Sequence, residues 1–288
     1  PQPLFPNIDG VKFLTGLDWS GQILSASAAT GIFWPVLAGY CAHPNVGGIT
    51  LLCRDGATYH TDLLGAYINR CDPAFAKPLL VADRMDYPGE FDWMAAATRE
   101  TFEAMTVLNR QTRQPAPLSR LTIGVRCAQD SGFSAYPAVS QYTTLLAEWG
   151  ATVLMADPGC NASLREASHP CARFQSPSEQ GLSVFHLPGD ATEITTALTA
   201  AGCTLHVSTM ALARPMGNPI APVAQLAATP TRRNRLMEDD MDTNGDYLVT
   251  QTAETILNYS LKVASGEAQT LSESQGMDDF KVYCPQAG

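Results

Sequence analysis

The chain has 288 residues, of which 45% are hydrophobic and 16% are charged. This length and composition predict a folded globular protein with a sizeable core, in one large domain or two medium ones. The formal net charge is −10 and the pI is about 4.9, so the surface repels nucleic acid and anionic membranes, and we expect neither partner. Local groups would have to capture an anionic substrate, because this charge does not attract one from a distance.

The eight cysteines are irregularly spaced, and none forms a CxxC pair. Several lie in apolar runs, which predicts buried thiols in a cytoplasmic protein rather than a disulfide framework. No secretory signal opens the chain, and no apolar run approaches the roughly 20 residues that span a bilayer. We therefore expect no membrane partner.

The first part of the chain contains three short apolar runs that predict strands, at Val11–Thr15, Ile49–Cys53 and Leu79–Ala82. The segment from Asp92 to Arg110 has apolar residues at helical spacing and is predicted to be a helix. The stretch Gln111–Pro117 carries two prolines and is predicted to be a linker.

From residue 118 onward, strand patterns alternate with helix patterns, which is typical of a parallel sheet. After about Pro215 the sequence is irregular up to one clear helix. We expect an α/β fold of parallel-sheet strand–helix units in two subdomains, residues 1–115 and 118–288, with a crevice between them. The predicted strands are Leu121–Cys127, Ala151–Ala156, Val184–Leu187 and Thr204–Ser208, and the predicted helices are Val139–Trp149, Thr192–Ala201 and Thr252–Ala264.

Several motifs, in the same order along the chain, resemble the altronate/galactarate dehydratase family of sugar-acid lyases. The tail carries the most specific ones: the acidic segment Met237–Gly245, the helix end Val263–Glu267 and the Ser272-Glu273 pair. Upstream, the resemblance includes the turn Gly217–Pro222 and the segment Ala38–Gly48, which reads AGYCAHPNVGG. Weaker matches are Asp9–Val11 and a shortened run from Cys127 to Ala138.

The resemblance implies a metal-dependent dehydration, in which a base removes a proton next to a carboxylate and a Lewis acid helps hydroxide to leave. This chain departs from the family pattern at the polar positions. The family's His and Cys are missing from Thr15–Ser20, its Cys and Glu from Cys53–Ala57, and two carboxylates from Met155–Gly159. We therefore predict a repurposed pocket without a metal site or other cofactor, and we leave a weakly held divalent metal open.

His43 and Asn45 match the family's His-Pro-Asn segment. His43 is a candidate general acid/base or ligand, with a turn-capping ring as the alternative. Asn45 is a candidate substrate-binding residue, or it holds the Pro-Asn turn.

Three candidates follow the predicted strand Leu121–Cys127, where ligands of parallel sheets bind. Asp130 is the candidate base and Arg126 the candidate clamp for a carboxylate or enolate. Ser131 is a candidate substrate-binding residue. The alternative is a polar loop in which Asp130 caps the next helix.

Three further residues complete the predicted site. Asp157 follows the next strand and is expected to face the same crevice, unless it lies in a solvated turn. Tyr136 would add an aromatic wall and a phenol donor. Trp19 would line an apolar pocket, or it belongs to the core.

These residues lead to three hypotheses about function. The first is a lyase or isomerase that acts on a small oxygenated substrate by proton abstraction and elimination. The second is a metal-free cyclase of specialised metabolism, including pericyclases, that uses the repurposed pocket. The third is a non-catalytic subunit that stabilises an active partner. A small-molecule substrate is the expected partner, and a homo-oligomer is left open.

Overall fold

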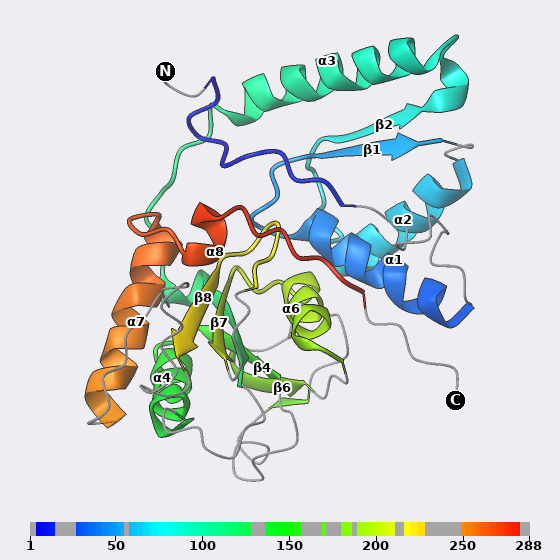
Figure 1. The fold of residues 1–288 in the computed structure, drawn as a ribbon. Coiled ribbons are helices and arrows are strands. Elements are labelled where there is room, and N and C mark those ends of the chain that lie inside the picture. The colour runs from blue at the N-terminus through cyan, green and yellow to red at the C-terminus, as the bar shows by residue number, and fades with distance from the viewer. Residues whose placement is uncertain are drawn as a thin grey trace.

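The computed structural model describes residues 4–14, 27–54, 58–127, 136–156, 169–170, 180–185, 189–210, 216–227 and 249–282. Its strands form two separate parallel sheets, one of two strands and one of six. In Figure 1 the small sheet and helix α3 lie above the large sheet, and helix α1 lies between the two levels. The predicted α/β class is confirmed. Within the described ranges, no helix has the length and apolar character needed to cross a membrane.

The small sheet is a strand–helix–strand unit. Strand β1 (Ile49–Cys53) pairs in parallel with β2 (Leu79–Asp83), and α2 (Thr58–Cys71) connects them. Alternate side chains of the strands point to opposite faces. One face packs on α2 and on α1 (Ser27–Ala42).

The other face of the small sheet packs on α3 (Glu90–Leu108), which follows a short 3-10 turn, η1 (Arg84–Asp86). Trp93 and Ala97 are the buried residues of this helix, and the indole of Trp93 donates to the Ala82 carbonyl at 2.9 Å. With α3 on this face and α1 and α2 on the other, the first sheet has a helical layer on both faces, as parallel sheets generally do.

The large sheet has the strand order β5-β6-β4-β3-β7-β8, and all neighbouring strands are parallel. One face packs on α4 and α7, where the Tyr142 hydroxyl lies 2.9 Å from the Ser260 hydroxyl. The opposite face packs on α6 through Leu154 and Leu198. The elements are β3 (Thr122–Arg126), α4 (Tyr136–Glu148), β4 (Thr152–Ala156), β5 (His169–Pro170), β6 (Gly181–Phe185), α6 (Ala191–Ala200), β7 (Leu205–Met210), β8 (Val223–Ala227), α7 (Val249–Ser265) and α8 (Leu271–Ser274); a 3-10 turn, η2 (Leu118–Arg120), precedes β3.

The chain builds the large sheet outward in two directions from β3. It first adds β4, β5 and β6 on one side, and then returns to add β7 and β8 on the other. The reversal of direction lies between β3 and β7. In open parallel sheets, the crevice beyond the carboxyl ends of the two strands at such a reversal is the usual ligand site.

The small and large sheets are joined by tight packing of α1 on α6. Gly39 of α1 lies against Ala200 of α6, where a Cβ atom on Gly39 would stand 2.1 Å from the Ala200 carbonyl oxygen. Beside this contact, the Asn218 side-chain amide donates to the Tyr40 hydroxyl at 2.7 Å, and the Phe280 ring packs edge-on against Tyr40. The two sheets lie within the predicted ranges 1–115 and 118–288, and the division into two subdomains stays a prediction.

Two predictions about the elements were wrong. The described part of Val11–Thr15 forms no strand: Val11 and Phe13 are exposed, and Lys12 between them pairs with Asp278 at 2.7 Å. The stretch after Pro215 is not irregular throughout, because it contains the buried strand β8. In both places, tertiary contacts decide the backbone conformation, and the local pattern does not.

Candidate functional site

His43 and Asn45 lie in the turn that follows α1. The Nε2–H of His43 donates to the Cys203 carbonyl at 2.9 Å, and its Nδ1 accepts from the Asn45 backbone N–H at 3.1 Å. The Asn45 side-chain amide donates to the Thr204 carbonyl at 3.0 Å and the Ile220 carbonyl at 2.9 Å. Both side chains therefore fasten the turn to the backbone that leads into β7 and β8.

The surroundings of His43 keep its ring neutral. The ring is buried, and burial lowers its pKa from the ordinary value to about 4. The bond to the Cys203 carbonyl opposes this shift, and the nearby Lys77 ammonium, which donates to the carbonyls of His43 and Cys41, reinforces it. With both ring nitrogens bonded, the geometry matches the turn-capping alternative and favours it over acid–base chemistry.

Arg126 lies at the carboxyl end of β3, at the reversal of direction in the sheet. Its Nη1 donates to the Ser208 hydroxyl of β7 at 3.1 Å, and the Thr209 hydroxyl lies 3.4 Å from the Arg126 carbonyl oxygen. Arg126 is partly buried and Ser208 is buried. Burial lowers the pKa of the guanidinium, while Cys127 and the charge of Asp190 act in the opposite direction.

The described carboxylate whose charge acts on Arg126 is that of Asp190, at the start of α6. The Asp190 side chain caps this helix by accepting from the Glu193 backbone N–H at 2.9 Å. The Lys281 ammonium bridges both acids, at 2.6 Å from Asp190 and 3.0 Å from Glu193. Burial would raise the pKa of Asp190, but the Lys281 and Glu193 bonds outweigh it and lower the pKa. Between described residues, these acids are paired with Lys281, and none forms an ion pair with Arg126.

The structure separates the predicted site residues into two places. His43 and Asn45 bind the backbone just before β7 and β8, which is the amino edge of the parallel sheet. Arg126 and its partner Ser208 lie at the carboxyl edge. Thr204 and Ser208 are four residues apart along β7, which corresponds to roughly 13 Å. A small molecule held by Arg126 is therefore out of reach of the His43 ring.

The other predicted site residues lie in whole or in part outside the described residues. Asp130, Ser131, Asp157 and Trp19 fall in ranges that the structure does not describe, and their roles stay predictions. Tyr136 is the first residue of α4, which is the next described element after β3, but its side chain is not among those described.

Ser208 is a further candidate for this site, and the sequence alone does not point to it. It was included only as the last residue of a predicted strand. The signal was present, because a hydroxyl at the carboxyl end of a buried strand neighbours the ends of adjacent parallel strands. What was missing was the strand order, which places β7 beside β3.

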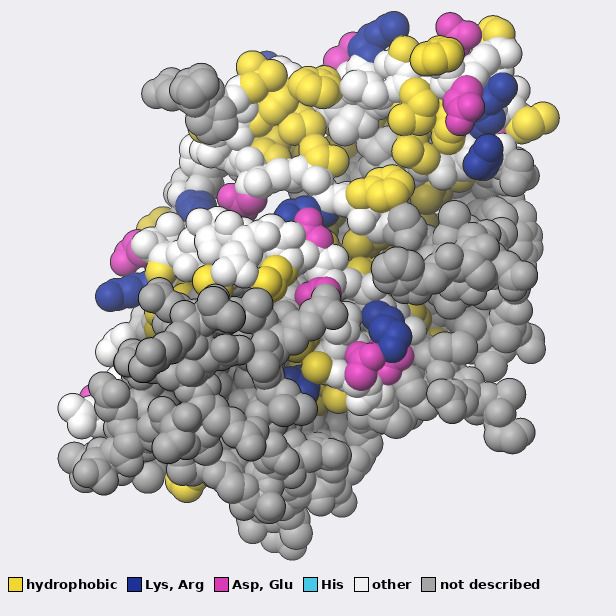
Figure 2. Space-filling view, in the orientation of Figure 1, with side chains coloured by type: hydrophobic (Ala, Val, Ile, Leu, Met, Phe, Trp, Pro, Cys, Tyr) yellow, Lys and Arg dark blue, Asp and Glu magenta, His cyan; other side chains and the backbone are white. Residues whose placement is uncertain are grey.

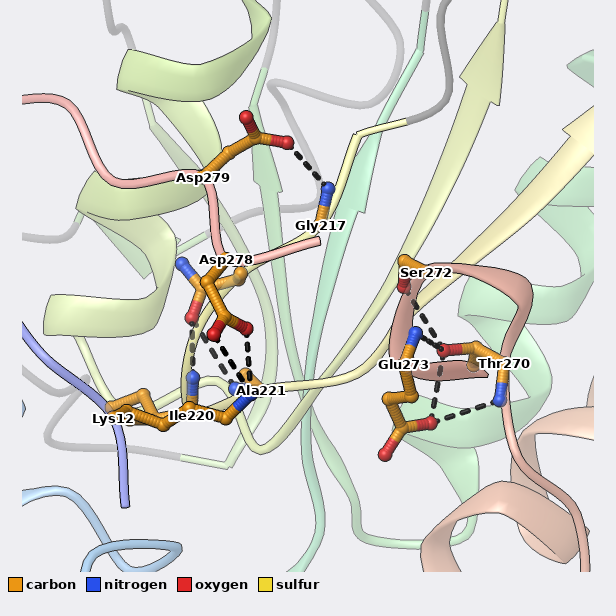
Figure 3. Close-up of polar contacts among 10 residues, drawn as sticks. Lys12, Gly217, Ile220, Ala221, Thr270, Ser272, Glu273, Asp278 and Asp279 are labelled. Carbon is orange, nitrogen blue, oxygen red and sulfur yellow. Dashed lines mark hydrogen bonds and ion pairs between the residues drawn. The ribbon is translucent and has the colours of Figure 1, made fainter. Parts of the chain in front are cut away.

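The C-terminal tail, through Asp279 and Met277, holds the turn before β8 in place, and Figure 3 shows the bond between Asp279 and Gly217. The Gly217 backbone N–H donates to the Asp279 carboxylate at 2.9 Å, and a Cβ atom on Gly217 would stand 1.9 Å from the Met277 carbonyl oxygen. The Asn218 side-chain oxygen accepts from the backbone N–H groups of Ile220 and Ala221. These residues serve the fold, because their polar atoms bind backbone groups of the turn.

The Ser-Glu pair of the tail has a similar role. Thr270 and Glu273 form a reciprocal cap at the start of α8, with bonds of 3.3 Å and 2.9 Å between side chains and backbone N–H groups. The buried Ser272 hydroxyl donates to the Val223 carbonyl at the start of β8. The tail is therefore stapled to the edge strand of the large sheet.

The described residues do not fit the metal that the family resemblance implies. Among them, no three His, Cys, Asp or Glu side chains gather into a candidate metal site. The nitrogens of His43 are bonded as described above, and Nε2 of the buried His206 lies 2.8 Å from the Thr199 hydroxyl. We derive no metal-dependent step from this part of the chain.

Comparison with known families identifies the C-terminal part of the chain. Residues 159–287 match the family model of D-galactarate/altronate dehydratase, C-terminal. The matched range contains Ser208, the α6 cap and the whole tail, and Arg126 and His43 precede it. A search of curated proteins finds no match.

Proposed function

We propose that the chain is a divergent member of the D-galactarate/altronate dehydratase family, whose C-terminal model matches residues 159–287, and that it is a lyase-type enzyme. Its reaction would be proton abstraction and elimination on a small oxygenated substrate. We place the reaction at the carboxyl edge of the large sheet, in the crevice between β3 and β7. The observation that carries this proposal is the position of Arg126 at that edge.

Arg126 has the properties of an anion clamp. A guanidinium has five N–H donors in a planar fork, and the structure gives one of them to Ser208. The group is partly buried, and a cation removed from water is stabilised by an anion more than an exposed one is. A substrate carboxylate, which becomes an enolate as its neighbouring proton leaves, offers two oxygens that match the fork.

The proton-transfer groups would come from the segments that follow β3 and β4. Asp130 is four residues beyond Arg126, and Asp157 directly follows β4. The carboxyl ends of neighbouring parallel strands share one edge, so both carboxylates are proposed to approach the substrate held by Arg126. Asp130 would remove the proton next to the carboxylate and pass it to the departing hydroxyl, which leaves as water as its C–O bond breaks and the new C=C bond forms. Ser131 or Ser208 would donate a hydrogen bond to the leaving group or to a substrate oxygen.

We assign His43 and Asn45 to the architecture of the enzyme and not to its chemistry. Their bonds to the carbonyls of Cys203, Thr204 and Ile220 fix the start of β7 and β8. The direction of β7 in turn sets where Ser208 meets Arg126. Replacing either residue should lower the free energy of unfolding and should leave the substrate specificity of the folded protein unchanged.

The test is a comparison of two arginines at opposite ends of β3. The purified protein would be offered a panel of small hydroxycarboxylates and matched uncharged polyols, with carbonyl formation and water loss followed by mass spectrometry. Arg126→Gln should lower kcat/KM for the carboxylates by about 10²-fold or more. Arg120→Gln is the matched control, because Arg120 is exposed at the amino end of the same strand and should leave the rate unchanged.

Either of two outcomes would overturn the proposal. Equal turnover by the wild type and the Arg126→Gln variant would show that Arg126 does not hold the substrate carboxylate. Binding and turnover of hydrophobic polyenes, with no response to any hydroxycarboxylate, would favour the cyclase.

A further inference from the structure

Helix α3 has an apolar stripe on the side that faces away from the small sheet. Phe91 is 93% exposed and Phe102 is 47% exposed. Ala95 and Thr98 lie between them, and the spacing of four, three and four residues puts all four on one side of the helix. Hydrophobic side chains gather in the upper part of Figure 2, over the region where Figure 1 shows α3.

The stripe contains no unsatisfied polar group. The Thr98 hydroxyl donates to the Met94 carbonyl at 2.7 Å, so its methyl group continues the apolar surface. At the carboxyl half, the Phe5 ring packs against Phe102 with centroids 5.7 Å apart and widens the stripe. The sheet-facing side of α3 is already buried through other residues. On this second apolar side Phe5 covers only part of Phe102, and Phe91 and Phe102 stay 93% and 47% exposed. A helix apolar on two sides is typical of one that packs between two bodies.

The order of large and small residues in the stripe is self-complementary. The midpoint lies between Ala95 and Thr98, with one Phe at an equal distance on each side. If a second α3 packs antiparallel about that midpoint, Phe91 of one copy lies opposite Phe102 of the other at both ends. The small residues meet in the middle, where they allow the helix axes to approach to about 8–10 Å.

The charges beside the stripe fit the same arrangement. Asp92 and Arg99 lie on one flank of the stripe, seven residues apart. In the antiparallel pair, Arg99 of each copy comes within roughly 3 Å, measured along the helix axis, of Asp92 of the other. Glu103 follows Arg99 by one turn and can share its guanidinium. The two helix dipoles also oppose each other, which is favourable for neighbouring helices.

We propose that the α3 stripe is the contact surface of a homodimer, in which two α3 helices pack antiparallel about a two-fold axis. The occupant of the stripe is a second copy of this chain, because the residue sizes and the charges both complement themselves. This dimer does not depend on the proposed catalytic site, which lies on the other sheet.

The first test compares two exposed aromatic residues by sedimentation velocity over a range of protein concentrations. The wild type is expected to reach twice the mass of the 30.9 kDa chain. Phe91→Glu should stay at the mass of one chain, with an unchanged circular dichroism spectrum because Phe91 is almost fully exposed. Trp149→Glu is the matched control: Trp149 is 51% exposed and lies outside α3, so this variant should dimerise like the wild type.

The second test examines the register of the two helices by charge exchange. Arg99→Glu or Asp92→Arg alone should weaken the dimer about tenfold, and the two together should restore it. A wild type that stays monomeric at every concentration would overturn the proposal. A dimer that survives Phe91→Glu would place the interface elsewhere, and a double variant no stronger than the single ones would reject the antiparallel register.

Discussion

The contact between Gly39 and Ala200 gives the sharpest test of how the two sheets are joined. A Cβ atom on Gly39 would stand 2.1 Å from the Ala200 carbonyl oxygen, 2.8 Å from its carbonyl carbon and 2.9 Å from its Cα. All three atoms belong to the backbone of α6, so no side chain can rotate away. The Gly39→Ala substitution therefore requires α1 and α6 to move apart by about 1 Å or more.

Two opposing effects determine how much the Gly39→Ala substitution changes the free energy of unfolding. Alanine is favoured over glycine in a helix interior by about 0.8–1 kcal/mol. Overpacking of a well-packed contact costs about 1–3 kcal/mol, and it also strains the neighbouring Tyr40–Asn218 bond of 2.7 Å. We expect the cost of overpacking to exceed the gain in helix propensity. The free energy of unfolding, measured by urea denaturation, should therefore fall by about 1–2 kcal/mol.

Gly31 supplies the control within the same helix. No atom lies within 4 Å of a Cβ built on it, so Gly31→Ala should stabilise the protein by about 0.4–1 kcal/mol. The two variants thus have opposite expected signs. If Gly39→Ala were as stable as Gly31→Ala, the helices would not be in contact at this position and the proposed junction would be incorrect.

Three further predictions concern the buried polar groups and the tail. Burial lowers the pKa of His43 to about 4 and that of His206 to about 3, so below the ordinary histidine pKa the unfolded chain binds more protons than the folded one. Denaturation midpoints should therefore be constant above the ordinary histidine pKa and fall as the pH drops below it. Midpoints that do not change with pH would contradict this. The hydroxyl pair Tyr142–Ser260 should show coupling of about 0.5–1.5 kcal/mol in a cycle of Tyr142→Phe, Ser260→Ala and the double variant, whereas strictly additive losses would refute the bond. Gly217→Ala should lower the free energy of unfolding by at least about 2 kcal/mol, because its Cβ would meet the Met277 carbonyl oxygen at 1.9 Å; unchanged thermal melting would show that the tail is not seated there.

Most elements of the large sheet follow from local pattern. The centres of strands such as Thr122–Arg126 and Thr152–Ala156 are buried and apolar, as is typical of strands covered on both faces. The helix Ala191–Ala200 has an acidic cap and apolar residues at helical spacing. These signals depend only on burial and capping, so the sequence displays them directly.

Helix α1 shows why other elements escape such reasoning. It is apolar around most of its surface and carries Gly31, Pro35 and Gly39 inside, all of which argue locally against a helix. Gly39 is there because α6 approaches so closely. Ala200, the residue that requires a glycine at position 39, is 161 positions away in the chain, so the neighbours of Gly39 in the sequence do not explain it.

The position of Arg126 in the fold was predictable from the sequence, and the position of His43 was not. Arg126 ends a buried strand, and the rule for parallel sheets places it at the ligand edge, where the structure also has it. His43 is a candidate because it matches the family's His-Pro-Asn segment, and that match says nothing about its distance from Arg126. Which edge of the sheet a turn reaches depends on how α1 docks, and that information is absent from the spacing of the residues.

The bonds that tie His43 and Asn45 to the residues before β7 and β8 all end on backbone carbonyls. A side chain that recognises the backbone does not register which amino acid supplies it. Substitutions at Cys203, Thr204 or Ile220 leave those three acceptors in place, provided the strands keep their course. The His-Pro-Asn turn can therefore keep its bonds while the side chains at Cys203, Thr204 and Ile220 change. The junction thus tolerates substitutions at these three positions, but it does not tolerate them at His43 and Asn45.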